Sequence, residues 1–301
     1  MKVLICDPIE PEAIDQMRQE GIEVDVKADI TPEELIATIP DYHGIVVRGR
    51  TKVTRKIIDA AKELKVIIRA GVGLDNIDMG YAQSKGITVL NTPAASSVSV
   101  AELTIGYLFA LARHIPQATA SLKANKWEKK RFRGEEIAGK TLGLIGCGRI
   151  GREVAKRAAA LGMRVIFYDV ISVDIPEATQ VAFDELLRTA DYISLHLPLT
   201  DETRGMIGAP QFEKMKKGVR IVQCARGGII DEDALYEAIK SGKVAGAALD
   251  VFDIEPAIDN RLFELDEVIG SPHIGASTVE AQARVGIEVA SLMINFYKEK
   301  N

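Results

Sequence analysis

The chain has 301 residues, of which 47% are hydrophobic and 27% charged, and its formal net charge is −5. This length exceeds what a single hydrophobic core usually fills, so we expect two domains. The mild acidity and the lack of a long basic run argue against nucleic acid or an anionic membrane as the main partner. The three cysteines, Cys6, Cys147 and Cys224, show no metal-binding spacing and are typical of reduced thiols in a cytoplasmic protein.

The first half of the chain alternates short β-branched runs with amphipathic stretches. Its N-terminus becomes polar too soon for a signal peptide, and no segment reaches the roughly 18 uninterrupted apolar residues of a membrane span. Alternation of this kind builds a parallel sheet with helices on both faces. We expect strands over residues 3–6, 23–26, 44–47, 66–69 and 88–90, with helices over residues 10–20, 32–39, 55–61 and 79–85.

A long helix is predicted over residues 98–121, as a crossover between the domains, and is followed by a Lys- and Arg-rich arm up to Glu136. We interpret the arm, with Trp127 and Phe132, as partly buried with solvated charges rather than as a nucleic-acid patch. A last helix, residues 278–297, could return to the first domain. Six strands between them match a doubly wound nucleotide domain, over residues 141–145, 164–168, 192–195, 220–223, 246–250 and 268–270.

A glycine-rich hexapeptide, Gly146-Cys147-Gly148-Arg149-Ile150-Gly151, stands between a strand pattern and a helix pattern. In a G-x-G-x-x-G turn the first glycine permits the tight bend, the second lets the backbone approach a pyrophosphate, and the third lets helix and strand pack. The helix N-terminus adds free N–H groups and a positive dipole end. Strand, turn and helix together predict a dinucleotide site, although a tight turn alone would also explain the glycines.

The acidic residue Asp169 ends the next predicted strand, roughly 20 residues after the glycine motif. A carboxylate at this place accepts hydrogen bonds from the ribose hydroxyls of NAD and repels the 2′-phosphate of NADP. The two residues that follow, Val170 and Ile171, are apolar instead of basic. The sequence therefore favours NAD, and the plain alternative is a solvated aspartate.

Three titratable side chains, Arg226, Glu255 and His273, each lie a few residues after a strand of the second half, where open α/β sheets bind ligands. Arg226 offers a planar fork for a carboxylate, and His273 can accept a hydroxyl proton while a hydride leaves. Glu255 can bind the other imidazole nitrogen and fix the tautomer. Together the three predict oxidation of a hydroxy acid, although each alone is equally consistent with an ordinary surface ion pair or loop residue.

These segments identify a resemblance to the D-2-hydroxyacid dehydrogenase family that runs from about residue 40 to about residue 290. The family's catalytic triad maps onto Arg226, Glu255 and His273. The resemblance implies two α/β domains with doubly wound parallel sheets, a Rossmann nucleotide domain inserted into a flavodoxin-like substrate domain. It rests on a substrate loop, a hinge, a cofactor loop and the three triad segments, over residues 69–78, 91–93, 139–151, 224–228, 250–256 and 272–277.

The same resemblance implies ligand contacts. The Val72 and Gly73 amides would bind the substrate carboxylate as an anion nest, together with Arg226 and His273. Asp250 would accept a hydrogen bond from the nicotinamide carboxamide. The implied NAD-binding residues are Gly146, Gly148, Arg149, Ile150, Gly151, Asp169, Leu197, Cys224, Ala225, Arg226, Asp250, His273, Gly275 and Ala276.

The tetrapeptide Arg48-Gly49-Arg50-Thr51 resembles an Arg-Ser-Arg-Thr segment that family members acting on 3-phosphoglycerate place near the substrate phosphate. Strand alternation would put Arg48 and Arg50 on one face, which suits a dianion, although a pair of surface arginines is the alternative. Gly49 replaces the usual serine and removes one donor. Two further departures, residues 94–97 after the hinge and Gln223 before Cys224, leave the triad intact.

The activity that the resemblance implies is NAD-dependent oxidation of 3-phospho-D-glycerate to 3-phosphohydroxypyruvate, the first step of L-serine biosynthesis. The nearest alternative is a glyoxylate or hydroxypyruvate reductase, or another D-2-hydroxyacid dehydrogenase. A corepressor-like NAD sensor of this fold is less consistent with the chain, because no disordered tails or peptide cleft are recognisable. No metal is expected. Longer relatives continue into a serine-binding regulatory domain, so we expect no serine feedback through such a domain here.

The expected domain limits follow from the hinge motif and the final helix. Residues 1–94 plus 277–301 would bind the substrate and residues 95–276 would bind NAD, with a cleft that closes on the substrate. As in relatives, the helix and arm over residues 98–136 would form a homodimer interface. We expect a cytoplasmic enzyme.

Overall fold

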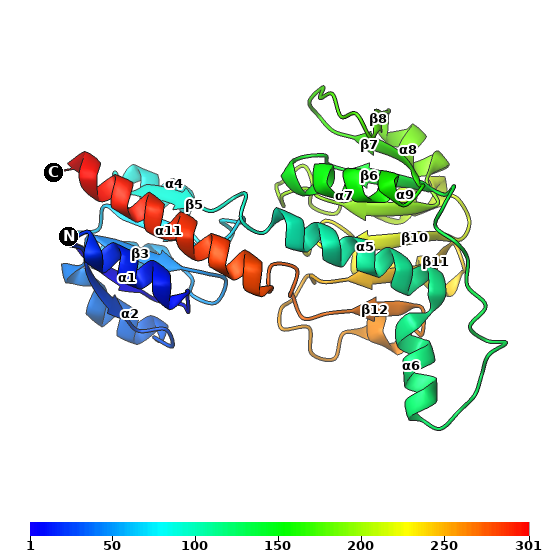
Figure 1. Cartoon of the computed structure of the whole chain (residues 1–301), viewed down its shortest axis with the longest axis horizontal. Helices are drawn as coiled ribbons and strands as arrows, with labels where there is room; N and C mark the ends of the chain where they lie inside the picture. The colour runs from blue at the N-terminus through cyan, green and yellow to red at the C-terminus, as the bar shows by residue number, and fades with distance from the viewer. Residues whose placement is uncertain (301) are drawn as a thin grey trace. The chain divides into compact units, whose positions relative to one another are not determined.

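A computed structural model describes residues 1–300 and divides the chain into two compact units. Unit 1 comprises residues 1–96 and 276–301, and unit 2 comprises residues 97–275. These limits lie within two residues of those expected from the sequence. Each unit is a parallel sheet covered by helices on both faces, which confirms the predicted fold class (Figure 1).

Unit 1 contains a five-stranded sheet in the order β2-β1-β3-β4-β5, which is the flavodoxin-like arrangement. All its strand pairs are parallel, and a continuous run of buried Val, Ile and Leu residues explains why it needs cover on both faces. The strands are β1 (Lys2–Ile5), β2 (Glu23–Val26), β3 (Gly44–Val47), β4 (Val66–Arg69) and β5 (Thr88–Asn91).

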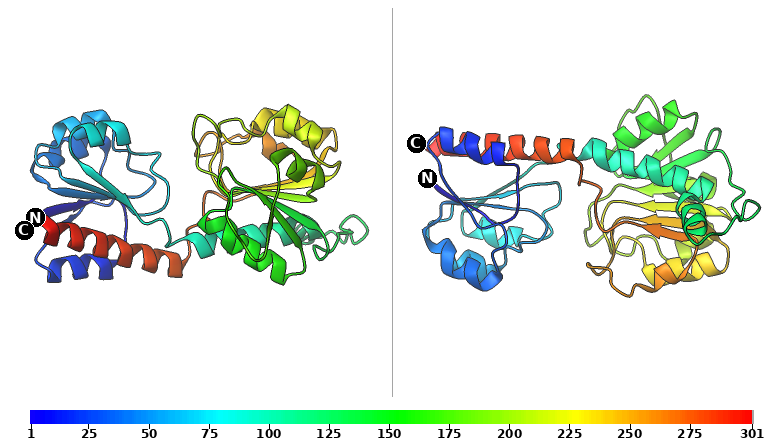
Figure 2. Two further views of the ribbon diagram at one scale, coloured as in Figure 1. Left: turned by 90° about the horizontal axis from the view of Figure 1, so that it is seen from above. Right: turned by 60° about the horizontal axis from the view of Figure 1, so that its bottom comes forward.

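The helices of unit 1 pack two separate cores against the sheet. α1 and the C-terminal helix α11 lie side by side on one face, and α2, α3 and α4 belong to the core on the other face (Figure 2). The N-terminus of α2 carries a capping box between Thr31 and Glu34. The bounds are α1 (Pro11–Gln19), α2 (Pro32–Thr38), η1 (Ile39–Asp41), α3 (Arg55–Ala60), α4 (Met79–Ser84) and α11 (Val279–Lys300).

Unit 2 contains a seven-stranded parallel sheet in the order β12-β11-β10-β9-β6-β7-β8. Numbered within the unit, this is the nucleotide-binding order with its switch point between β6 and β9. Ligands of such sheets bind outside the carboxyl ends of the strands. The strands are β6 (Thr141–Ile145), β7 (Arg164–Tyr168), β8 (Thr179–Gln180), β9 (Tyr192–Leu195), β10 (Val219–Gln223), β11 (Val244–Leu249) and β12 (Val268–Gly270).

Helices α5 and α7 cover one face of this sheet, and α8, α9 and α10 cover the other (Figure 1). Among residues 1–300 no single helix is long and apolar enough to cross a membrane; only α5 and α6 together, which bend by 64°, pass by length and composition. The bounds are α5 (Ser97–Arg113), α6 (Ile115–Lys123), α7 (Arg149–Ala160), α8 (Phe183–Thr189), α9 (Ala209–Lys214), α10 (Glu232–Lys240) and η2 (Arg261–Glu264).

Three sequence-based expectations about the elements were wrong. The helix expected over residues 98–121 is broken at His114, which has φ +53°, because Pro116 in the next turn cannot continue the hydrogen-bond ladder. The seventh strand, β8, has only two residues and therefore gave no periodic signal. Strand β3 ends at Val47, so strand alternation does not orient Arg48 and Arg50.

Candidate active site

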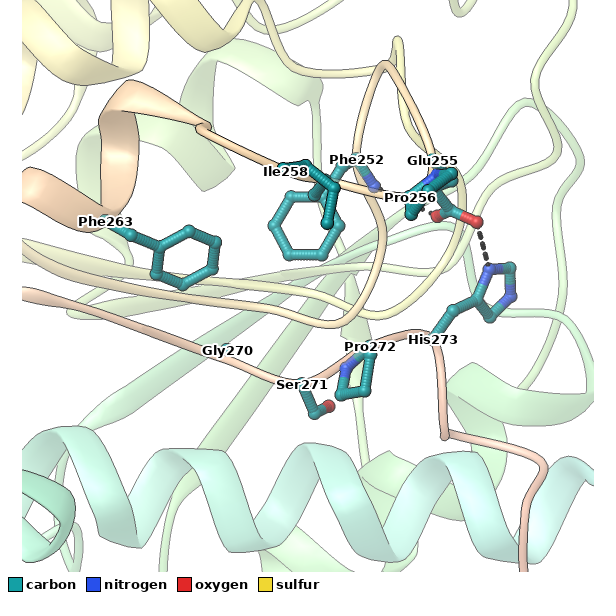
Figure 3. Close-up of a pocket in the computed structure, with 10 residues that line it drawn as sticks. Phe252, Glu255, Pro256, Ile258, Phe263, Gly270, Ser271, Pro272 and His273 are labelled. Atoms are coloured by element: carbon teal, nitrogen blue, oxygen red, sulfur yellow. Dashed lines mark hydrogen bonds and ion pairs between the residues drawn. The ribbon is translucent and has the colours of Figure 1, made fainter.

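Glu255 and His273 form a hydrogen-bonded dyad at the carboxyl edge of the sheet of unit 2. Glu255 lies on the loop after β11 and His273 lies three residues after β12, and these two strands are paired. The His273 Nδ1 atom lies 2.8 Å from the Glu255 Oε2 atom (Figure 3). The other carboxylate oxygen accepts a hydrogen bond from the Phe252 backbone amide at 3.2 Å, which fixes the orientation of Glu255.

The backbone of His273 has a left-handed conformation, with φ +53°. A non-glycine residue rarely adopts this conformation, and its cost is met by the surrounding contacts. The His273 amide donates to the Ser271 carbonyl at 3.0 Å, and the next amide, that of Ile274, donates to the Asp250 carboxylate at 2.8 Å. The imidazole is thus held by contacts on both sides of its own residue, while its side chain stays 45% exposed.

Arg226 lies three residues after β10, the strand next to β11. Its side chain is half-buried, and the Nη1 atom donates to the Ala225 carbonyl at 2.6 Å. The buried Gln223 amide braces this turn, since it donates to the Arg226 carbonyl at 2.9 Å and accepts from the Ala225 amide at 3.1 Å. The three side chains chosen from the sequence therefore come from three adjacent strand ends.

A pocket of about 370 Å³ opens beside the dyad. The Phe252 and Phe263 rings, with centroids 5.6 Å apart, form its apolar end, while Glu255 and His273 form its polar end (Figure 3). This pocket was not predictable from the sequence, because its aromatic residues lie far enough apart that no local pattern links them. The remaining lining residues are Pro256, Ala257, Ile258, Gly270, Ser271 and Pro272.

The glycine motif forms the turn between β6 and α7. Gly146 has φ +86°, and a side chain there would meet the His196 carbonyl at 2.6 Å. A side chain at Gly151 would meet the Gly146 carbonyl at 2.7 Å, so both positions are glycine for reasons of packing. Gly148 is different, because it has an ordinary φ of −71° and open space around it. Its exposed backbone at the start of a helix fits an approaching pyrophosphate.

Asp169 follows β7 and is half-exposed. Its Oδ2 atom accepts a hydrogen bond from the Cys147 amide at 2.8 Å, so the acidic residue is attached to the glycine turn itself. The other oxygen accepts weakly from the Ile171 amide at 3.3 Å and is accessible to a ribose hydroxyl. The two residues that follow, Val170 and Ile171, are exposed and apolar, so neither offers a cation to a 2′-phosphate.

The other residues expected to bind the cofactor differ in how far they are buried. Arg149 is exposed, Ile150 and Leu197 are half-buried, and the Leu197 side chain lies against Gly146. Cys224 and Ala225, by contrast, are buried in the cores on the two faces of the sheet. Burial raises the pKa of the Cys224 thiol to about 12, so the thiol stays neutral. Gly275 and Ala276 follow the His273 loop, and the Gly275 amide donates to the Asp250 Oδ2 atom at 2.8 Å.

In unit 1, the Arg48–Thr51 loop is organised by the buried carboxylate of Asp7. Asp7 accepts hydrogen bonds from the Arg48 amide at 2.5 Å, from the Thr51 hydroxyl at 2.9 Å and from the Arg50 Nε atom at 3.0 Å. The Arg50 guanidinium also donates to the carbonyls of Cys6 and Ala28. Much of the donor capacity of Arg50 is therefore used inside the chain. The Arg48 guanidinium donates to the Pro8 carbonyl at 3.3 Å.

The glycine-rich loop after β4 holds the other residues expected to bind substrate. The amides of Val72 and Gly73 donate to no other residue within the described part of the chain, so both are available to an anion. The Asn91 side chain donates to the Val72 carbonyl at 2.6 Å and fixes the loop. The Arg69 side chain lies over Gly71 and places a cation at this loop, and no sequence motif indicated this role for Arg69. Among residues 1–300 no cluster of His, Cys, Asp or Glu side chains could hold a metal ion.

The model of the D-isomer specific 2-hydroxyacid dehydrogenase NAD binding domain matches residues 105–275. The chain is 54% identical to D-3-phosphoglycerate dehydrogenase of Archaeoglobus fulgidus over 99% of its own length but only 58% of that relative's length. It is also 54% identical to hydroxypyruvate reductase of Thermotoga maritima, over 96% of this chain and 95% of that relative. The structure of Aquifex aeolicus D-lactate dehydrogenase with NAD and lactic acid superimposes with a TM-score of 0.87 at 31% identity, covering 99% and 96% of the two chains.

The chain therefore belongs to the D-isomer specific 2-hydroxyacid dehydrogenase family, and unit 2 contains the family's NAD-binding domain. NAD, predicted from the glycine motif and Asp169, is confirmed as the cofactor of this family. The chain spans a little more than half the length of the first phosphoglycerate dehydrogenase relatives that it matches.

Proposed function

We propose that this protein oxidises 3-phospho-D-glycerate to 3-phosphohydroxypyruvate with NAD as hydride acceptor. The support is the 54% and 55% identity to relatives named D-3-phosphoglycerate dehydrogenase, together with a cationic loop in unit 1. The single observation that carries the chemistry is the 2.8 Å contact between Glu255 and His273. On this proposal unit 1 binds the substrate and unit 2 binds NAD.

In the proposed mechanism the His273 Nε2 atom accepts the substrate proton. Because the Glu255 carboxylate can only accept, the His273 Nδ1 atom carries the hydrogen, and the Nε2 atom is left with its lone pair. The Nε2 atom then takes the proton of the C2 hydroxyl while the hydride leaves C2, and the nearby carboxylate stabilises the imidazolium that forms. In the reverse reaction the same atom returns the proton.

Arg226 would hold the substrate carboxylate in this mechanism. The Val72 and Gly73 amides of unit 1 donate to no other described residue and form an anion nest that suits an acidic group of the substrate. In unit 2 the exposed Gly148 and Arg149 backbone at the start of α7 would receive the pyrophosphate, and Asp169 would bind the ribose. Bound NAD supplies the acceptor for the hydride. Asp250 would orient the nicotinamide through the carboxamide.

The proposal is tested by following NADH formation with 3-phosphoglycerate and with unphosphorylated D-glycerate. We expect a strong preference for the phosphorylated acid in the native protein. Arg48→Ala should lower kcat/KM for 3-phosphoglycerate about tenfold or more and leave D-glycerate nearly unchanged, because a charge-assisted hydrogen bond is worth roughly 1.5–3 kcal/mol. Arg50→Ala tests the second arginine and needs an unfolding measurement beside it, since Arg50 also pairs with Asp7. Equal effects on both substrates would contradict a phosphate site.

The second candidate is hydroxypyruvate reduction. Two observations favour it: the Thermotoga maritima relative with that name is matched over 95% of its length, and Arg50 is turned toward Asp7. Its signature would be NADH-dependent turnover of hydroxypyruvate that exceeds turnover of 3-phosphohydroxypyruvate. In that case the dyad and the NAD site keep their assigned roles, and only the substrate changes.

We also infer a cytoplasmic homodimer that uses α6 and the arm after it. Trp127 is 83% exposed, and Leu122 and Ile115 are 57% and 50% exposed, which is an unusual density of exposed apolar side chains. A second copy of the chain would cover them, and the three buried free cysteines suit a reducing compartment. Sedimentation should give a dimer at micromolar concentration, and Trp127→Glu should shift it to monomer; a native monomer would contradict this inference.

A further inference from the structure

Two hydroxyl groups, one on a buried and one on a half-buried residue, connect α5 to the carboxylate of Asp250. Tyr107 lies on α5 and is 8% exposed, and its hydroxyl lies 2.5 Å from the Ser271 Oγ atom. The Ser271 hydroxyl in turn contacts the Asp250 Oδ1 atom. Tyr107 and Ser271 are 164 residues apart in sequence, so this contact is made only by the folded unit 2.

The direction of the hydrogen bonds in this chain follows from donor capacity. The Asp250 carboxylate can only accept, so Ser271 gives its single hydrogen to Asp250. The Ser271 oxygen must then accept from the Tyr107 hydroxyl. Burial raises the pKa of Tyr107 above its ordinary value, so the phenol keeps this proton throughout the working range of an enzyme. The series Tyr107 to Ser271 to Asp250 therefore has one orientation.

The Asp250 carboxylate accepts three hydrogen bonds and has one acceptor position left over. The Oδ1 atom accepts from Ser271 and from the Ile274 amide, and the Oδ2 atom accepts from the Gly275 amide. A carboxylate offers about four acceptor positions, so one position remains on the Oδ2 atom. Asp250 is 1% exposed, and an unfilled acceptor on a buried charge is costly unless a ligand completes it.

We propose that Tyr107 and Ser271 are positioning residues that hold the Asp250 carboxylate so that the remaining Oδ2 position faces the nicotinamide carboxamide. This proposal rests on the proposed NAD-dependent activity. Saturating Oδ1 prevents the carboxylate from rotating, because rotation would break two hydrogen bonds at once. The same carboxylate holds the Ile274 amide beside His273, so one anion aligns both the cofactor ring and the proton acceptor.

The test compares NAD with its 3-acetylpyridine analogue, in which a methyl group replaces the amide donor. We expect the native protein to bind NAD about tenfold more tightly than the analogue, as measured by calorimetry. Ser271→Ala should reduce this preference to about twofold, and Tyr107→Phe should reduce it by an intermediate amount. ADP-ribose, which lacks the nicotinamide, should bind equally to all variants.

Two controls separate positioning from general damage. Tyr236→Phe removes a phenol from α10, on the opposite face of the sheet, and should keep the native preference. Ser271→Thr restores a hydroxyl and should restore at least part of the preference. A Ser271→Ala variant that retains the native preference, or one that loses affinity equally for NAD, the analogue and ADP-ribose, would overturn the positioning role. Failure of the native protein to bind NAD would instead contradict the proposed function.

Discussion

Each unit has a buried aspartate just after a strand of its sheet, but the two carboxylates have different kinds of hydrogen-bond donors. Asp7 follows β1 in unit 1 and Asp250 follows β11 in unit 2, and each is 1% exposed. Asp7 is paired with the guanidinium of Arg50 at 3.0 Å. Among the described residues, the donors to Asp250 are neutral, namely the Ser271 hydroxyl and two backbone amides.

This difference teaches how one residue type at a strand end can serve two purposes. The charge of Asp7 is compensated within the chain, so Asp7 acts as a scaffold that shapes the Arg48–Thr51 loop. The charge of Asp250 is stabilised by dipoles without being cancelled, which leaves an anion able to attract a further donor. Unit 1 thus uses its aspartate for structure, and on our proposal unit 2 uses its aspartate for recognition.

The largest effect should come from Asp250→Asn. An amide oxygen cannot accept all three present donors, and the NH₂ group would face one of them. We expect about a hundredfold loss of kcat/KM in NADH formation, because charge-assisted hydrogen bonds are worth roughly 1.5–3 kcal/mol each. The exposed Asp259→Asn variant is the matched control. A near-native rate for Asp250→Asn would contradict the role of the Asp250 carboxylate in recognition.

Asp7→Asn should damage stability and leave the cofactor site intact. Breaking a fully buried ion pair costs about 3–5 kcal/mol. Because the Arg50 side chain is 49% exposed, we expect a smaller loss of about 2 kcal/mol in the free energy of unfolding. Urea unfolding gives this value, and NADH affinity should be unchanged. If NADH affinity falls as it does in the Asp250 variant, the two aspartates do not have separate purposes.

The Gln223→Ala variant tests whether the neutral side-chain amide of Gln223 holds the Arg226 turn in place. Gln223 precedes the Arg226 turn, and its carbonyl accepts from the Asp250 amide at 2.9 Å. Removing its side-chain amide leaves two backbone groups of the turn without partners, so we expect kcat to fall about tenfold. Steady-state kinetics would show this, with the exposed Gln83→Ala as control. An unchanged kcat would mean that strand β10 alone positions Arg226.

The smallest effect concerns His196, a half-buried neutral side chain after β9, at the same sheet edge as Asp250. Burial lowers its pKa from 6.5 to about 4, and its Nδ1 atom has no partner among the described residues. Below about pH 6.5 the His196 imidazole binds a proton in the unfolded chain but not in the folded chain. The free energy of unfolding therefore decreases as the pH is lowered from about 6.5 to about 4.

Urea unfolding at about pH 7 and at about pH 5.5 measures this effect. Between these two pH values the free energy of unfolding should decrease by about 1 kcal/mol more in the native protein than in the His196→Gln variant. Other groups titrate in both proteins, and the difference isolates His196. An identical pH dependence in the two proteins would show that His196 does not contribute.

The sequence predicted the fold because its signals are local. Strands such as β3, β4, β6 and β12 have the expected bounds, since each is a short and mostly apolar run. The helix break at His114 was missed although Pro116 marks it in the sequence. The strand β8 was missed because two residues are too few to show a period.

The candidate site was predictable where titratable side chains follow predicted strands. Arg226, Glu255 and His273 were chosen for their positions after strands, and the structure brings Glu255 and His273 into contact; their catalytic roles stay predictions. The inward turn of Arg50 toward Asp7 and the contact between Tyr107 and Ser271 were not predictable. Both depend on residues that are distant in sequence and meet only after the strands are ordered.

The C-terminal helix α11 has a consequence for how the protein is made. α11 packs beside α1 on one face of the unit 1 sheet, so α1 alone leaves part of that apolar face uncovered until α11 arrives. All of unit 2 lies between these two parts of the chain. On a ribosome, unit 2 can therefore complete its core before unit 1 does, which reverses the usual order of N-terminal domain first. Nascent chains that lack α11 should then be bound by chaperones at the uncovered face of unit 1.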